Sequence, residues 1–74
     1  MTTSQDITIS VNGEPRRVPA GASLLDVLGT MGIGSDTRGV AVAVGDHVVR
    51  RSDWSTTALA DGARVEVVTA VQGG

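Results

Sequence analysis

The chain has 74 residues and a net charge of −2, with no cysteine and only arginine among its six basic residues. This length allows one domain with a thin core, and without cysteine there is no disulfide, thiol nucleophile or thiolate metal site. The mild acidity and the single aromatic residue, Trp54, exclude the basic, stacking surface of a general nucleic-acid binder.

The composition also bears on the cellular location of the protein and on the kinds of partner it can have. The first residues carry neither a basic patch nor an apolar run, so no secretory signal is predicted. No apolar stretch approaches the ~20 residues that span a bilayer. We expect a cytoplasmic protein that is monomeric on its own, binds no metal or cofactor, and has neither nucleic acid nor membrane as a partner.

Residues 6–18 are predicted to form a β-hairpin. Their first half alternates polar residues with the apolar residues Ile7, Ile9 and Val11, as in a half-buried strand. The Asn12-Gly13 pair that follows is typical of a type I′ turn. Pro15 cannot donate to a strand ladder, so the return strand is expected at an edge of the sheet.

A short helix is predicted to begin after Ser23. Ser23 is the expected N-cap, and Asp26 provides the acidic partner of a capping box. Gly29 weakens the helix and Gly32 is expected to end it. The predicted apolar stripe consists of Leu24, Leu28 and Met31, with Leu25 beside them.

The segment 32–39 is predicted to be a loop, because it lacks the Lys-Ser/Thr ending of a phosphate-binding loop. Residues 40–44 alternate valine and alanine, which predicts a strand with large residues on one face and small ones on the other. Gly45-Asp46 is expected to turn the chain into a short return strand over 48–50. His47 is expected to be an exposed turn residue.

Residues 51–54 are predicted to form one helical turn, with Trp54 packed over one end of the core or over the second strand pair. A contact between Trp54 and a partner protein is the alternative. Asp61-Gly62 is a turn signal. The final strand is expected over 64–71, with Glu66, Val68 and Ala70 on the face opposite Val65 and Val67.

This order of elements predicts an α+β fold of the β-grasp type. A mixed sheet of four or five strands has one helix packed across it. The first and last strands lie parallel and central, because a parallel pair needs a connection that contains a helix. The predicted domain covers residues 1–71, and residues 72–74 form a flexible tail.

The tail ends in Gly73-Gly74. Glycine has no Cβ, so two glycines make a thin, flexible end that can enter a narrow channel. The carboxylate of Gly74 is ionised at neutral pH, and it is a competent nucleophile toward an activated phosphate that another protein supplies. A frayed terminus without a role is the alternative.

The sequence resembles the ThiS family of sulfur carriers over nearly its whole length. The stretches that carry the resemblance are residues 11–14, 21–28, 40–44, 49–54, 59–62, 65–68 and 71–74. The resemblance implies that a ThiF-like activating enzyme uses ATP to adenylate the carboxylate of Gly74, which sulfur then converts to a thiocarboxylate. It further implies that the carrier, itself not an enzyme, donates this sulfur to a ThiG-like thiazole synthase in thiamine biosynthesis.

A docking surface for the activating enzyme is expected on the sheet face opposite the helix. This surface is predicted to be a shallow apolar patch with two flanking arginines that attract an acidic partner. Ordinary solvated sheet residues are the alternative interpretation. The candidate residues are Ala41, Ala43, Val68 and Ala70, with Arg50 and Arg64 beside them.

Two other functional classes remain open. One is a related carrier, such as the small subunit of molybdopterin synthase or a ubiquitin-like modifier, with the same chemistry and another acceptor. The other is a non-covalent β-grasp binding module like the TGS-type regulatory domains, whose opening is similar to residues 18–24. That second class leaves Gly73-Gly74 unexplained.

Overall fold

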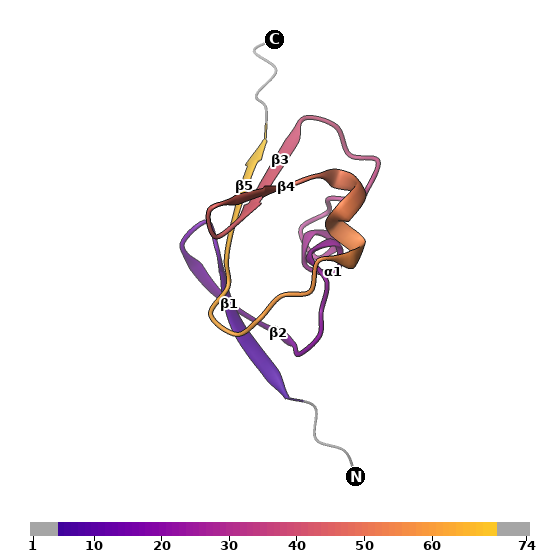
Figure 1. The fold of residues 1–74 in the computed structure, drawn as a ribbon. Helices are drawn as coiled ribbons and strands as arrows, with labels where there is room; N and C mark the ends of the chain where they lie inside the picture. Colours follow the sequence, from indigo (N-terminus) through magenta and orange to yellow (C-terminus); the bar gives the residue numbers. More distant parts are fainter. Residues whose placement is uncertain (1–4, 70–74) are drawn as a thin grey trace.

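Five strands form one mixed sheet in the computed structural model, which describes residues 5–69 (Figure 1). The strands are β1 (Asp6–Val11), β2 (Glu14–Pro19), β3 (Val40–Val44), β4 (His47–Val49) and β5 (Arg64–Thr69). Their order is β2-β1-β5-β3-β4, with β1 and β5 parallel and the other neighbours antiparallel. The prediction of a β-grasp sheet with parallel, central first and last strands is therefore confirmed.

The β1–β2 hairpin has the turn that its sequence predicts. Asn12 and Gly13 both have positive φ, 52° and 87°, as a type I′ turn requires. Strand β2 lies at an edge of the sheet, where the missing N–H of Pro15 removes no ladder hydrogen bond.

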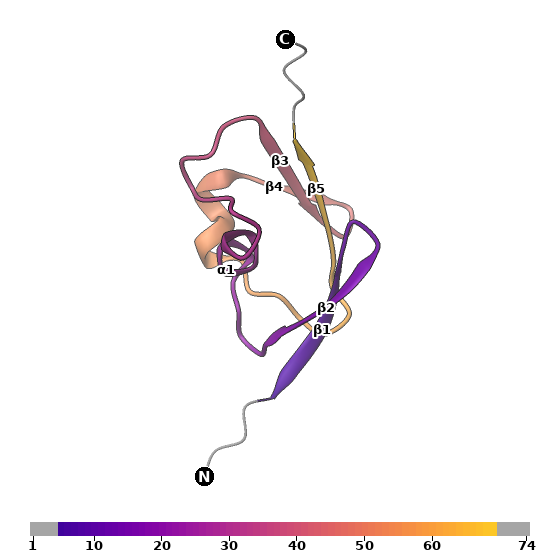
Figure 2. The ribbon, with the colours of Figure 1, turned by 180° about the vertical axis from the view of Figure 1, so that it is seen from behind.

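Helix α1 (Leu24–Gly29) covers one face of the sheet, as the two opposite views show (Figures 1 and 2). Its capping box is present: Asp26 N donates to Ser23 Oγ at 3.1 Å, and Ser23 N donates to Asp26 Oδ2 at 3.0 Å.

The predicted apolar stripe of the helix needs a correction. The buried helix residues are Leu24, Val27 and Leu28, whereas Leu25 and Met31 are only half-buried. The helix ends at Gly29, before Met31, so the spacing i, i+3, i+4 of a short helix sets the buried face.

The second half of the chain follows the predicted order with shifted boundaries. Strand β4 includes His47, which is exposed, and ends before Arg50. The two-residue turn fixes this start, because Val44 pairs with His47. The predicted helical turn is a 3-10 helix, η1 (Arg51–Thr56), which is longer than the four residues expected. The last residues of the predicted final strand, 70 and 71, lie outside the described residues.

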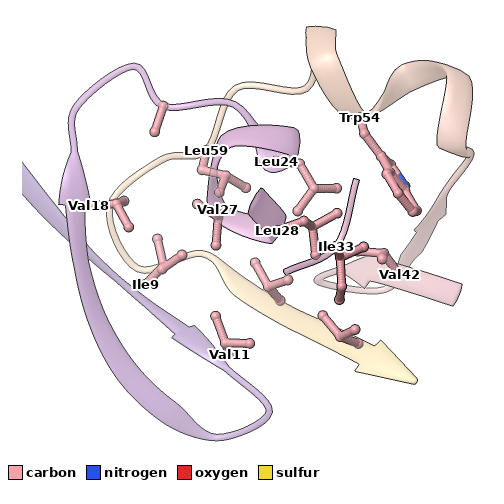
Figure 3. Packing of buried hydrophobic residues seen from close by; sticks show 13 residues of the cluster. Ile9, Val11, Val18, Leu24, Val27, Leu28, Ile33, Val42, Trp54 and Leu59 are labelled. Atoms are coloured by element: carbon pink, nitrogen blue, oxygen red, sulfur yellow. The ribbon is translucent and has the colours of Figure 1, made fainter. Parts of the chain in front are cut away.

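The core lies between α1, η1 and the inner face of the sheet. Figure 3 shows Trp54 over the end of the cluster that contains Val42 and Ile33, with Ile9 and Val18 at the other end. The indole of Trp54 is 1% exposed and donates from Nε1 to Val49 O at 3.1 Å. Trp54 therefore covers the β3–β4 strand pair, one of the two positions that the sequence predicted for it.

Candidate functional site: the outer face of the sheet

The sheet face that points away from α1 carries a shallow apolar hollow. In β5, Val65 and Val67 are buried, so Glu66 and Val68 project from the outer face. In β3, Val42 is buried and its neighbours Ala41 and Ala43 project outward in the same way. The outer-face patch, as we call it, surrounds a hollow of about 150 Å³ and consists of Ala41, Ala43, Val48, Glu66 and Val68.

Strand register brings these side chains together. Ala41 pairs with Val68, and Ala43 pairs with Glu66 on one side and with Val48 on the other. Val48 and Val68 are the large apolar side chains that the described residues leave most open to solvent, 78% and 64% exposed. The small alanines between them make the surface concave.

The patch lies close to the point where the described part of β5 ends. Val68 precedes Thr69, the last residue of β5, and Thr69 pairs with Val40 at the start of β3. A protein that covers the patch is therefore next to Thr69, the last residue that the structure describes. Three predicted site residues, Ala70, Gly73 and Gly74, lie outside the described residues.

The two predicted flanking arginines occupy different places. Arg64 is exposed and begins β5, where it pairs with Ser10 of β1, so it lies at the end of β5 remote from Val68. Arg50 is also exposed, but it follows β4 and is the residue that precedes η1. Arg64 lies two residues before Glu66 and Arg50 two residues after Val48, so each is close in sequence to one residue of the patch, and a role in attracting an acidic partner stays a prediction.

Two patch residues were absent from the predicted site, Val48 and Glu66. The sequence does contain a signal for Val48, because a two-residue turn at Gly45-Asp46 pairs Val44 with His47 and hence Ala43 with Val48. An outward Ala43 therefore requires an outward Val48. Glu66 follows from alternation with Val65, and its carboxylate gives an otherwise apolar surface one negative charge.

A larger hollow, of about 370 Å³, lies between the end of β2 and α1, where Val18, Ala20 and Val27 are among its lining residues. The end of β2 that borders this hollow is at the opposite end of the sheet from the end of β5 (Figure 1). The pairing of Asp6 with Pro19 fixes this separation, since β1 runs parallel to β5 and its later residues, Ser10 and Val11, pair with Arg64 and Val65 at the start of β5. Size therefore favours this hollow as a binding site, whereas proximity to the end of β5 favours the outer-face patch.

The described residues provide two hollows at the surface. Within residues 5–69, no group of three histidine, aspartate or glutamate side chains is placed to hold a metal ion. Neither helix within residues 5–69 combines the length and the apolar character needed to cross a membrane. An exposed apolar surface such as the outer-face patch is suited to contact with another protein.

Comparisons with known proteins agree with this fold. The chain is similar to the crystal structure of the thiamine biosynthesis protein (ThiS) from Geobacter metallireducens, with a TM-score of 0.74 and 24% sequence identity. The similarity covers 92% of this chain and 100% of that one. No curated protein matches the sequence. The model of the ThiS family matches residues 9–74, and the chain therefore belongs to the ThiS family.

Proposed function

We propose that this protein is the sulfur carrier of a thiamine biosynthesis pathway and that its reactive group is the carboxylate of Gly74. A ThiF-like enzyme supplies ATP, the carboxylate attacks the α-phosphorus, and pyrophosphate leaves. Sulfur at the oxidation level of sulfide then attacks the acyl carbon of the adenylate and displaces AMP, so the product is a C-terminal thiocarboxylate. The loaded carrier donates this sulfur to a ThiG-like thiazole synthase.

The extent of the family match is the observation that carries this proposal. It runs from Ile9 in the first strand to Gly74, so it includes both the folded body and the two glycines. A carrier needs both parts, one for recognition and one for chemistry. Because activation consumes ATP, we place the carrier in the cytoplasm.

The length of chain beyond β5 limits where the activating enzyme can bind. Five residues follow Thr69, and five extended residues reach at most about 18 Å. The nucleotide must therefore lie within that distance of the end of β5. The outer-face patch meets this limit, because Val68 is adjacent to Thr69. We therefore assign the patch, rather than the larger hollow beside β2, as the docking surface of the activating enzyme.

The free-energy cost of ordering the tail in the enzyme calls for a docking surface that compensates for it. Fixing the backbone of five residues in a channel costs about 5–10 kcal/mol. Complete burial of Val48 and Val68 contributes about 3–6 kcal/mol, and both are largely exposed in the free protein. The patch offsets about half of the ordering cost, and contacts of the tail within the enzyme supply the rest.

The direct test is the reaction itself. The full chain is incubated with a ThiF-like enzyme, ATP and a sulfur source, and its intact mass is measured. A mass increase that matches replacement of one oxygen by sulfur is expected, and a chain that lacks Gly73 and Gly74 shows no increase. If the full chain also keeps its mass under conditions in which the enzyme activates another carrier, the proposal is wrong.

The acceptor is tested separately. The thiocarboxylate form is offered in parallel to thiazole synthase and to the large subunit of molybdopterin synthase. Transfer to thiazole synthase is expected. Transfer to the molybdopterin enzyme alone would reassign the protein to that pathway while leaving the activation chemistry intact.

A further inference from the structure

The free edge of β4 carries an unused pair of backbone hydrogen-bonding groups. Gly45 N donates to Arg64 O at 2.8 Å, so the backbone groups of alternate residues in β3, including Ala43, face β5. Those of Val44 and Val42 face β4, where their partners are His47 and Val49. Val48 lies between these two, so its N–H and C=O point out of the sheet.

The edge at β2 differs in its donors. Ala20 N donates to Gln5 O at 2.8 Å, and the same alternation directs the backbone of Pro15, Arg17 and Pro19 out of the sheet. Two of these three residues have no N–H. Prolines at outward positions protect an edge against the addition of another strand. Strand β2 therefore has this protection, whereas β4 contains no proline and is limited in pairing by its length of three residues.

The sequence around Val48 is complementary to itself. In an antiparallel pair of two β4 strands centred on Val48, the N–H and C=O of each Val48 bind those of the other. Residues that are equally distant from the centre then face each other. Asp46, the turn residue directly before β4, and Arg50, directly after β4, are equally distant from Val48, so this register brings Asp46 of one copy near Arg50 of the second copy. Both side chains are exposed in the single chain. Two-fold symmetry gives this pair of opposite charges twice.

We infer that two copies of this chain associate through β4, in antiparallel register about Val48, into one continuous sheet with Asp46–Arg50 ion pairs at both ends. The side chains of the two Val48 residues, each 78% exposed in the single chain, lie side by side on the outer face. The edge has only three residues, so the contact is far smaller than a standard interface and the association is weak. This weak association differs from the monomer expected from the sequence, and the oligomeric state stays a prediction until it is measured.

Charge reversal tests the register. D46R and R50D each replace two ion pairs by two repulsive contacts, and each is expected to weaken association about tenfold. An equimolar mixture of the two variants is expected to associate as well as the original protein, because each Asp then faces an Arg. Sedimentation velocity from about 10 µM to about 1 mM covers the range of weak association.

Control variants with the same change in net charge distinguish ion pairing across the contact from a general effect of net charge. D36R and R38D change the same residue types in the exposed loop before β3, and neither they nor their mixture should change the association. Circular dichroism verifies that all four variants are folded. The inference is wrong if the protein stays monomeric at 1 mM, or if the mixture of D46R and R50D associates no better than either variant alone.

Amide spectra give a second measurement that needs no substitution. The amide of Val48 should shift with protein concentration, because it gains a hydrogen bond in the dimer. The amide of Arg17 also points out of the sheet, but at the opposite edge, and should not shift. A larger shift at Arg17 than at Val48 would move the contact to β2 and overturn the assignment. The inference does not depend on the sulfur-carrier function.

Discussion

Asn12 binds both backbone groups of Val67 with its side-chain amide, across 55 positions of sequence. Val67 N donates to Asn12 Oδ1 at 2.8 Å, and Asn12 Nδ2 donates to Val67 O at 3.2 Å. The backbone N–H of Asn12 also donates to Val65 O at 2.9 Å. Strand β1 ends at Val11, yet a side chain continues its pairing with β5 toward Thr69. One residue therefore forms the hairpin turn and holds the strand that leads to Gly74.

Replacing Asn12 should separate these two roles. Asn12→Gly keeps the positive φ without strain and loses both side-chain hydrogen bonds, so it should reduce the free energy of unfolding by about 1–3 kcal/mol. Asn12→Ala also places a Cβ in a left-handed conformation and should cost about 1–2 kcal/mol more. Urea unfolding, followed by Trp54 fluorescence, measures both. Equal stability of Asn12→Gly and the original protein would show that the Val67 contacts contribute nothing.

The core is small, so a single cavity should remove a large share of the free energy of unfolding. Leu28 is 0% exposed, and Leu28→Ala should lower the free energy of unfolding by about 2–5 kcal/mol, a large share of the 5–15 kcal/mol typical of a domain. Leu25 lies on the same helix but is only half-buried, so Leu25→Ala is the matched control and should cost less. Thermal unfolding of both variants measures the difference. Equal losses would contradict the buried face of α1 as described.

Loss of the hydrogen bond from the Trp54 indole should lower the stability of the protein. Trp54→Phe keeps most of the buried aromatic surface and leaves Val49 O without the donor that lies 3.1 Å away. We expect a loss of about 1–3 kcal/mol in the free energy of unfolding. Trp54→Ala should lose about 3–5 kcal/mol. Calorimetry gives both values, and a more stable Trp54→Phe variant would contradict a structural role for the Nε1 bond.

The two hollows can be compared through one substitution in each. Val68→Asp places a charge in the outer-face patch and should weaken binding of the activating enzyme about tenfold or more, because a desolvated carboxylate is costly. Ala20→Asp places the same charge in the larger hollow beside β2, where Ala20 is exposed, and should leave the affinity unchanged. Titration calorimetry with the activating enzyme decides. Reversed effects would assign docking to the hollow beside β2.

Gly74→Ala should spare the fold and impair activation. Residue 74 lies outside the described residues, so the prediction depends on the chemistry of the tail: a Cβ beside the reacting carboxylate crowds a narrow channel and displaces the nucleophile. Small misplacements of reacting groups reduce rates by on the order of 10²-fold. Pyrophosphate release measures the adenylation rate, and thermal unfolding verifies that stability is unchanged. Full activity would count against entry of the tail into a channel.

Local backbone chemistry allowed much of this fold to be predicted from sequence. Asn12-Gly13 favours positive φ at both turn positions, and Ser23 with Asp26 satisfies the first N–H groups of the helix. Alternating valines identify the strands because side chains project to opposite faces in turn. These signals depend on residues a few positions apart, so the order of the elements and hence the β-grasp class followed from them.

Strand neighbours across long sequence distances decided the rest. Val48 joins the outer-face patch because β4 pairs with β3 and β3 with β5. Trp54 is fixed by the carbonyl of Val49, and Asn12 by a strand that lies 55 positions away. Packing also determined that Val27, and not Met31, lies on the buried face of the helix, which ends at Gly29. A local pattern sets the faces of one element, but only the assembled sheet sets which faces meet, because register and burial are properties of several elements at once.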